Sequence, residues 1–299
     1  MTRAVSEVSR LGALSEATVA LEAAGIDTAR QEAEWLLASV LGLERFALYL
    51  DPGQQLSPVV AGRYRSLVAR RAARVPLQYL LGFEEFHGLR LTVTPDALIP
   101  RPETEGLVEW ALETLRDQPA AIVADIGTGC GAIACALARS LPELRVLAVE
   151  CSLPALAVAS LNVGKLGLSR RVTLLAGDLL DVFGPHGLDL VVANPPYIPS
   201  AVVASLPPEV SGFEPRRALD GGADGMAVIR RIIAGASFAL RPRGRLMMEI
   251  GEEQAGPLAS LMAAEGFTGL QARHDLAGRE RYICGQWSET SSPVPRRTC

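Results

Sequence analysis

The residues best suited to do chemistry stand together in one short turn, Asn194-Pro195-Pro196-Tyr197. The apolar run 188–193 before it predicts a buried strand, which ends at Asn194 because the two prolines carry no N–H group for a sheet. A turn at the carboxyl end of a strand is where ligands bind in open α/β sheets. This turn offers the amide of Asn194, the free carbonyl of Pro195 and the ring of Tyr197, a set that can hold a planar NH2 group. A proline-rich turn in which Asn194 only caps the chain is the alternative that this stretch alone leaves open.

A second group of candidate residues follows the preceding strands. The sequence Asp125-Ile126-Gly127-Thr128-Gly129-Cys130-Gly131 ends one strand, and its glycines allow a tight turn and close approach of a ligand to a helix N-terminus. Glu150 ends the next strand, where a carboxylate can accept both hydroxyls of a ribose. Asp178 ends the third strand and is placed to meet the amino group of an adenine. Together with Asn194, these residues predict a site for one extended nucleoside ligand.

The glycine pattern also fits a different class of enzyme. Gly127-x-Gly129-x-x-Ala132 with Glu150 satisfies a loose dinucleotide fingerprint, so an NAD-dependent oxidoreductase is a candidate. The turn at Asn194 separates the two interpretations, because hydride transfer has no use for two acceptors aimed at an NH2 group. The chain also offers no evident acid or base there for carbonyl chemistry.

Alternating strand and helix signals after Gln118 predict the element that positions these residues, a doubly wound α/β sheet. Strands are expected at Ala121–Ile126, Arg145–Glu150, Val172–Leu175, Leu188–Ala193, Arg245–Ile250, Leu270–Arg273 and Arg281–Gly285. Helices are expected at about Ala132–Ser140, Leu153–Leu166, Met226–Leu240 and Glu253–Glu265. Only a short turn joins the last two strands, so one of them should run antiparallel to its neighbour.

The first part of the chain has a different pattern, which predicts a small helical domain over residues 1–85. The expected helix N-caps are Ser15, Thr28 and Ser57, the last followed by Pro58, and the expected helix ends are Gly25 and Gly42. Residues 86–103 are expected to link the domains, with a hairpin over Phe86–Ile99 and a proline-stiffened segment from Pro100 to Glu105 that starts a helix. The catalytic domain is expected over 104–287, and the polar, proline-rich residues 288–299 are expected to be disordered.

Composition excludes several classes of function. A formal charge of −4 and a pI near 5.6 argue against stable binding of long nucleic acids through their phosphates. The five cysteines form no CxxC pair and have no histidine cluster nearby, so neither a disulfide framework nor a metal site is expected, and a reducing cytoplasm fits. No signal peptide and no apolar stretch long enough to span a membrane is evident.

The glycine loop from Asp125 and the turn at Asn194 together resemble the S-adenosylmethionine-dependent amino-methyltransferases. More narrowly, the chain resembles the peptide chain release factor glutamine methyltransferases. The segments that carry this resemblance are Pro100-Arg101-Pro102-Glu103-Thr104-Glu105, Phe213-Glu214-Pro215-Arg216-Arg217-Ala218-Leu219, Gly221-Gly222 with Asp224-Gly225, and Glu249-Ile250-Gly251 with Gln254. The resemblance extends over nearly the whole chain up to the tail. It implies a seven-stranded, Rossmann-like class I methyltransferase sheet and methylation of the glutamine amide in the Gly-Gly-Gln motif of class 1 release factors, a step of translation termination.

The resemblance also implies roles for individual residues. S-adenosylmethionine would be bound by Asp125, Gly127, Thr128, Gly129, Gly131, Glu150, Asp178, Leu179, Asn194 and Arg101. The glutamine would be bound by Asn194, Pro195, Pro196, Tyr197, Leu98 and Glu105, with Asn194, Pro195 and Tyr197 as the catalytic set. The family often has aspartate where this chain has Glu150. Alternatives are a sibling family that methylates a ribosomal protein glutamine, an adenine-N6 nucleic-acid methyltransferase, and a non-catalytic nucleoside-binding module.

Overall fold

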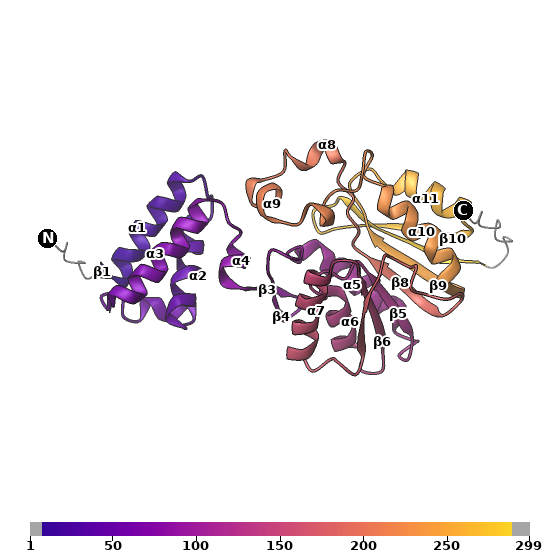
Figure 1. Cartoon of the computed structure of the whole chain (residues 1–299), viewed down its shortest axis with the longest axis horizontal. Coiled ribbons are helices and arrows are strands. Elements are labelled where there is room, and N and C mark those ends of the chain that lie inside the picture. Colours follow the sequence, from indigo (N-terminus) through magenta and orange to yellow (C-terminus); the bar gives the residue numbers. More distant parts are fainter. Residues whose placement is uncertain (1–7, 289–299) are drawn as a thin grey trace. The chain divides into compact units, whose positions relative to one another are not determined.

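A computed structural model describes residues 8–288 of the chain, so the tail predicted to be disordered lies outside the described residues from 289 onward. The described residues form two compact units (Figure 1). One contains residues 8–83 together with Pro207–Phe213, and the other contains Glu84–Leu206 together with 214–288. The smaller unit is therefore built from two separate stretches of the sequence.

The smaller unit is a helical bundle. Its elements are β1 (Val8–Ser9), α1 (Arg10–Ala23), α2 (Ala29–Leu41), the 3-10 helix η1 (Arg45–Tyr49), β2 (Gln55–Leu56), α3 (Pro58–Ala72), α4 (Leu77–Leu81) and α9 (Pro208–Phe213). Leucines at helical spacing on α1 and α2, among them Leu14, Leu21, Leu36 and Leu37, are almost fully buried and form its core with Tyr64 of α3. The apolar residues that recur at helical spacing in the sequence thus lie on the inner faces of the helices and pack into one core.

The helix starts in this unit agree only in part with the predicted N-caps. Ser57 caps α3 as predicted and accepts a hydrogen bond from the Val60 N–H at 3.4 Å, with Pro58 at the first helical position. The prediction for Ser15 is wrong, because α1 already begins after Ser9, whose side chain accepts from the Gly12 N–H at 3.1 Å. Thr28 is the N-cap residue of α2 as predicted, but its side chain makes no capping hydrogen bond, since its hydroxyl donates to Glu32 at 2.8 Å. Ser9 and Ser15 both lie near the start of α1, and the residue type alone does not show which of the two side chains caps the helix.

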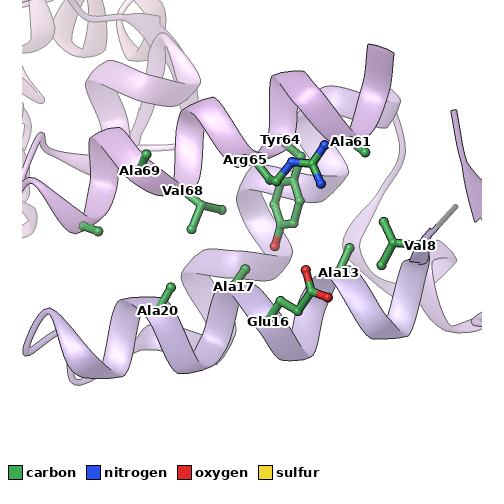
Figure 2. A pocket seen from close by; sticks show the side chains of 11 residues that line it. Val8, Ala13, Glu16, Ala17, Ala20, Ala61, Tyr64, Arg65, Val68 and Ala69 are labelled. Carbon is green, nitrogen blue, oxygen red and sulfur yellow. The ribbon is translucent and has the colours of Figure 1, made fainter. Parts of the chain in front are cut away.

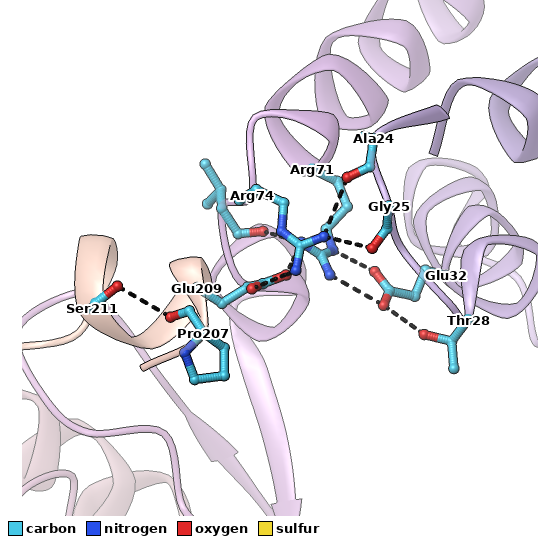
Figure 3. A network of polar contacts seen from close by, with 10 residues as sticks. Ala24, Gly25, Thr28, Glu32, Arg71, Arg74, Pro207, Glu209 and Ser211 are labelled. Carbon is cyan, nitrogen blue, oxygen red and sulfur yellow. Dashed lines mark hydrogen bonds and ion pairs between the residues drawn. The ribbon is translucent and has the colours of Figure 1, made fainter. Parts of the chain in front are cut away.

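A buried ion-pair network ties the separate α9 stretch to the rest of this unit (Figure 3). Arg71 of α3 is only 6% exposed and pairs with Glu32 of α2 and, at 2.9 Å, with Glu209 of α9. Arg74 pairs with the same Glu209 at 2.9 Å and donates to the Gly25 carbonyl at 2.8 Å. Arg71 of α3 therefore serves the interior of the unit, and Arg74, just beyond the end of α3, supports it from a partly exposed position.

An apolar groove of about 300 Å³ runs between α1 and α3 of the helical unit (Figure 2). Helix α1 lines it with small side chains, Ala13, Ala17 and Ala20, and α3 lines it with Ala61 and Ala69. The groove exists because alanines on both helices leave the space between them unfilled.

The larger unit opens with a hairpin and a helix. Strands β3 (Phe83–Phe86) and β4 (Leu89–Thr92) pair around the turn at His87-Gly88, and α5 (Pro102–Leu115) follows. The predicted hairpin is too long at its end, because residues 93–99 form turn and loop, a stretch broken by Pro95.

The core of the larger unit is a seven-stranded sheet, as predicted. Its strands are β5 (Ile122–Ile126), β6 (Arg145–Glu150), β7 (Val172–Ala176), β8 (Leu188–Ala193), β9 (Leu240–Glu249), β10 (Phe267–His274) and β11 (Glu280–Trp287), in the order β10-β11-β9-β8-β5-β6-β7. Strands β5 to β9 run parallel to one another, and β11 runs antiparallel to both β9 and β10, which confirms the expected reversal.

Helices cover both faces of this sheet (Figure 1). Helices α5, α6 (Ala132–Ser140) and α7 (Leu153–Lys165) pack on one face, and α10 (Ala227–Ala239) and α11 (Ala255–Ala264) pack on the other. The apolar periodicity of the sequence does not predict α8 (Ser200–Val203) or the 3-10 helix η2 (Arg216–Ala218), because both are too short for a periodic signal.

The strand order reverses at one point of the sheet. The chain moves outward from β5 to β6 and β7, then returns to β8 on the other side of β5. Ligands bind at such a reversal, beyond the carboxyl ends of the strands. Ile126, the last residue of β5, pairs with Ala193, the last residue of β8. The glycine loop and the turn at Asn194 therefore begin side by side.

Candidate active site

The turn that follows β8 is held in place by close backbone packing. A Cβ atom on Gly221 would meet the Pro196 carbonyl, and one on Gly225 would meet the Tyr197 carbonyl. Gln254 donates its side-chain amide to the same Tyr197 carbonyl at 3.1 Å. The glycines are thus required for the approach of one segment to the other, and the turn has a fixed position.

Asn194 is joined to two buried residues from other elements. Its Nδ2 donates to Thr104 Oγ1 at 3.0 Å, and the Thr104 hydroxyl donates to Glu249 Oε2 at 2.6 Å. Glu249 Oε1 accepts from the Tyr197 hydroxyl at 3.1 Å. Within residues 8–288, no hydrogen bond is made to Asn194 Oδ1 or to the Pro195 carbonyl oxygen. The turn thus has two acceptor oxygens, Asn194 Oδ1 and the Pro195 carbonyl oxygen, that receive no hydrogen bond from the described residues.

Glu249, at the end of β9, is the deepest acid in this network. It is 1% exposed, and burial raises the pKa of its carboxyl, while hydrogen bonds from Thr104 and Tyr197 oppose the rise. Burial also raises the pKa of the Tyr197 hydroxyl, so this group stays protonated and donates. The prediction that the Tyr197 ring faces a ligand stays a prediction, and the structure shows that the Tyr197 hydroxyl donates to Glu249.

The glycine loop after β5 has a backbone that only glycine adopts readily. Gly127, Gly129 and Gly131 have positive φ values of 72°, 57° and 85°. A Cβ atom on Gly127 or Gly129 would project into open space, with no atom within 4 Å. The space next to the backbone of Gly127 and Gly129 is therefore open, and a ligand could lie against the backbone there.

Two acids, Asp125 and Glu150, are hydrogen-bonded to this loop. Asp125 Oδ2 accepts from the Thr128 hydroxyl at 2.5 Å and from the Ala134 N–H at 3.1 Å. Its Oδ1 is buried without a partner among the described residues, and burial raises the pKa of Asp125 to about 6. Glu150 accepts from the Gly129 N–H at 3.0 Å and from the Ser152 N–H at 2.9 Å. Both carboxylates thus lie in contact with the loop that the sequence pattern placed beside them.

The residues after the third parallel strand, β7, include Asp178 and Leu179, and the Asp178 carboxylate is more exposed than those of Asp125 and Glu150. The Asp178 side chain is 56% exposed and pairs at 2.7 Å with Arg231 of α10. Leu179 has a φ of 52°, an uncommon conformation for a branched side chain. Asp178 therefore lies at the same edge of the sheet as the other strand-end acids. Its carboxylate forms an ion pair with Arg231, a contact that the sequence pattern does not predict.

The segment before α5 has its own partners. Arg101 binds both oxygens of Glu214 at 2.6 and 2.8 Å, and Glu214 is buried at 7% exposure. Burial raises the pKa of Glu214, and Arg101 opposes this rise. Glu105 accepts from the His87 N–H at 2.7 Å, in the turn of the β3–β4 hairpin, and Leu98 is half-buried. Arg101 and Glu105 therefore stabilise the segment through contacts that point to other parts of the same unit.

Thr104, Glu214 and Glu249 lie in segments that carry the family resemblance, but the resemblance assigns no individual site role to any of the three. One signal could have found Glu249. It ends an apolar strand with a carboxylate, as Glu150 does, so the argument used for β6 applies equally to β9. No local sequence pattern predicts the hydrogen bond between Thr104 and Glu249, because 145 residues separate them in the chain.

A seven-stranded sheet of this order, with a glycine loop after its first parallel strand, an acid after the second and polar residues after the fourth, defines the class I methyltransferases. Residues 12–82 match the family model of the PrmC N-terminal domain, and residues 108–205 match that of the methyltransferase small domain. The chain belongs to the release factor glutamine methyltransferase family.

Two relatives show this membership. The release factor glutamine methyltransferase of Geobacter sulfurreducens is 46% identical over 262 residues, which cover 88% of this chain and 91% of that protein. The enzyme of Moorella thermoacetica is 47% identical over 270 residues, with coverage of 90% and 95%. Among solved structures, the catalytic domain of hMettl16 in complex with an RNA hairpin has a TM-score of 0.56 at 22% identity, over 77% of this chain and 84% of that one. That likeness shows the fold alone.

Two further structural findings concern membrane helices and metal-binding groups. In the described part of the chain, none of the helices is both long and apolar enough to cross a membrane. Residues 8–288 also contain no group of three or more His, Cys, Asp or Glu side chains arranged to hold a metal ion.

Proposed function

We propose that this protein transfers a methyl group from S-adenosylmethionine to the side-chain amide nitrogen of the glutamine in the Gly-Gly-Gln motif of class 1 release factors. The observation that carries the proposal is the pair of acceptors without donors, Asn194 Oδ1 and the Pro195 carbonyl, beside the glycine loop. A primary amide has two N–H bonds, so these two acceptors match it in number and in chemistry.

The residues around the glycine loop fit the cofactor. Open space in front of Gly127 and Gly129 allows a nucleoside to lie against the backbone. Glu150, held in place by two backbone N–H groups, keeps lone pairs free for the two hydroxyls of a ribose. The buried, unpartnered Oδ1 of Asp125 favours a positively charged or N–H-bearing group above the loop. Thr128, Gly131, Asp178, Leu179 and Arg101 complete the proposed cofactor site.

The chemistry depends on a weak nucleophile. When bound, S-adenosylmethionine supplies an electrophilic methyl group on a sulfonium sulfur. The amide nitrogen is a poor nucleophile because its lone pair is delocalised into the carbonyl. As the nitrogen forms its bond to the methyl carbon, the carbon–sulfur bond breaks with its electron pair going to sulfur, and positive charge grows on the N–H2 group. Asn194 Oδ1 and the Pro195 carbonyl stabilise that charge by accepting both N–H bonds.

No general base is required before the transfer. The nitrogen becomes acidic only as it bonds to the methyl carbon, and its proton then passes to water. Catalysis thus consists of positioning and of electrostatic preorganisation. Pro196 stiffens the turn, and Tyr197 anchors it through Glu249.

The choice of substrate rests on the surroundings of the turn, since glutamine and adenine both present an NH2 group. We assign recognition of the protein substrate to the helical unit, residues 8–83 with Pro207–Phe213, and a narrow entrance to the segment with Leu98 and Glu105. The acidic balance of the chain disfavours phosphate contacts, which a flipped base would need. A glutamine at the tip of a Gly-Gly turn is slender enough for a narrow entrance.

The experiment is incubation of the purified protein with methyl-labelled S-adenosylmethionine and a purified class 1 release factor. Mass spectrometry should find one added methyl group on the glutamine of the Gly-Gly-Gln motif. A release factor with that glutamine replaced by alanine is the matched control and should gain no label. Label on nucleic acid, on a ribosomal protein from cell extract, or on the alanine variant would contradict the proposal.

A further inference from the structure

We infer that Thr104 and Glu249 are positioning residues that fix the Asn194 amide with its oxygen, and not its nitrogen, toward the substrate. This inference rests on the proposed function, because it concerns the same amide-binding turn. It goes beyond that function by assigning a role to two buried residues that neither bind the substrate nor touch the reacting atoms.

The direction of the amide follows from counting protons. Glu249 accepts from Tyr197 on one oxygen, and its other oxygen lies 2.6 Å from Thr104 Oγ1. An ionised carboxylate has no proton to give, so the single proton of the Thr104 hydroxyl lies on the bond to Glu249. Thr104 Oγ1 then has only lone pairs left for Asn194, 3.0 Å away, and Asn194 must donate to it with Nδ2.

The reversed amide is unfavourable on both of its sides. With Oδ1 toward Thr104, two oxygens without a proton between them would face each other in a buried place, since Thr104 is 4% exposed. On the substrate side, Nδ2 would point its protons at the NH2 group of the glutamine. The network therefore selects the amide orientation that accepts from the substrate, before the substrate arrives.

The network also joins two other parts of the fold to the turn. Thr104 lies in the first turn of α5, Glu249 ends β9, and Tyr197 follows Asn194 by three residues. The hydrogen bonds thus lead from Asn194 through Thr104 and Glu249 back to the same turn. Such a closed set of bonds holds a side chain more firmly than one contact does.

The ionisation of Glu249 controls the direction of these bonds. The charged groups that act on it are Arg281, which favours the carboxylate, and Glu103, which disfavours it, and burial raises its pKa. A proton on Glu249 would occupy the bond to Thr104 and release the Thr104 hydroxyl proton toward Asn194. The reversed amide would then become possible, so acid should lower kcat.

The first test compares kcat, KM and cofactor affinity for Thr104→Val, Thr104→Ser and the wild type with the release factor as substrate. Valine has the shape of threonine without the hydroxyl, and we expect kcat to fall about 10-fold, the effect of one net hydrogen bond. Calorimetric affinity for S-adenosylmethionine should change by less than about a factor of two, since the residue does not contact the cofactor. Serine should restore kcat. Thr173→Val, on the exposed face of β7, is the matched control and should behave as wild type.

The second test is independent of the stability of the Thr104 variants. Glutamine at position 249 accepts from Thr104 but does not titrate, so Glu249→Gln should lose the acid limb of kcat that the wild type shows at saturating cofactor. Unchanged kcat in Thr104→Val, a parallel loss of cofactor binding, or an acid limb that persists in Glu249→Gln would each overturn the inference. No methylation of the release factor by the wild type would instead overturn the proposed function, and the inference with it.

Discussion

The Glu150 carboxylate at the end of β6 accepts a hydrogen bond from the Gly129 N–H at 3.0 Å, in the loop that follows β5. The acid proposed to bind the ribose therefore also fixes the loop proposed to lie beneath the cofactor. Its second oxygen accepts from the Ser152 N–H at 2.9 Å, so the carboxylate has a fixed orientation before any ligand binds. Preorganisation of this kind lowers the cost of ordering a site on binding.

Replacement of Glu150 by alanine should weaken S-adenosylmethionine binding. The ribose would lose a charged acceptor pair, and we expect a loss of about 1.5–3 kcal/mol in binding free energy. Isothermal titration calorimetry measures this directly. Glu143→Ala removes an exposed acid near the start of the same strand and should leave the affinity unchanged. Equal affinity in Glu150→Ala would remove Glu150 from the cofactor site.

Replacement of Asn194 by alanine should affect the chemical step. We expect kcat to fall by roughly 10²–10³, which is the loss typical of one preorganised polar group aimed at a transition state. Affinity for S-adenosylmethionine should stay nearly intact, because Asn194 acts mainly on the amide of the substrate. Single-turnover kinetics with the release factor separates the two effects. A variant that retains kcat within a factor of a few would show that the acceptor pair is not the source of catalysis.

The strands that carry the site could be predicted from sequence more reliably than the contacts between them. The ends of β6 and β8 agree with prediction to the residue, because each is an apolar run with a polar residue or a proline turn after it. Strand β9 begins five residues earlier than predicted, at Leu240. Arg241 and Pro242 are not typical strand residues, so the sequence does not indicate a strand there. The contact between Asn194 and Thr104 depends on the packing of α5 against the sheet, and no local pattern encodes that packing. Local propensity thus places the strand ends, and tertiary packing decides which side chains meet.

The buried Asp125 should make stability depend on pH. Its folded-state pKa is raised to about 6 by burial, above the usual value for aspartate, so the folded state holds this proton more tightly than the unfolded chain. The contribution is therefore favourable at low pH and is lost as pH rises from about 4 to 6. Asp125→Asn does not titrate, and its free energy of unfolding relative to wild type should rise by about 2 kcal/mol between pH 4.5 and pH 7.

Urea denaturation of both proteins at the two pH values tests this, because the change between them cancels the fixed effect of the substitution. Asp117→Asn, at an exposed position, is the control and should show no such change. A difference between Asp125→Asn and wild type that stays constant with pH would contradict the assignment.

The Arg71 network should dominate the stability of the helical unit. Arg71 is 6% exposed and pairs with Glu32 and Glu209, so Arg71→Ala would leave Glu32 without its arginine partner and Glu209 with Arg74 alone. We expect a loss of about 3–5 kcal/mol in the free energy of unfolding of this unit, as for other buried pairs from which one partner is removed. Arg63→Ala, at an exposed position on the same helix, should change it by less than about 0.5 kcal/mol. Equal stability of the two variants, measured by chemical denaturation, would show that the network contributes little.

The last prediction concerns the size of the substrate. If the helical unit binds the release factor, part of the binding energy arises far from the glutamine and can be used to hold the amide against Asn194 and Pro195. A short peptide that contains Gly-Gly-Gln lacks these remote contacts and also pays the entropy of ordering its own backbone. We therefore expect its kcat/KM to be lower than that of the folded release factor by on the order of 10²-fold. Steady-state kinetics with the full chain and both substrates measures the ratio, and the Gln→Ala version of each substrate gives the background. Equal kcat/KM values would mean that the turn alone selects the glutamine and that the helical unit has another role.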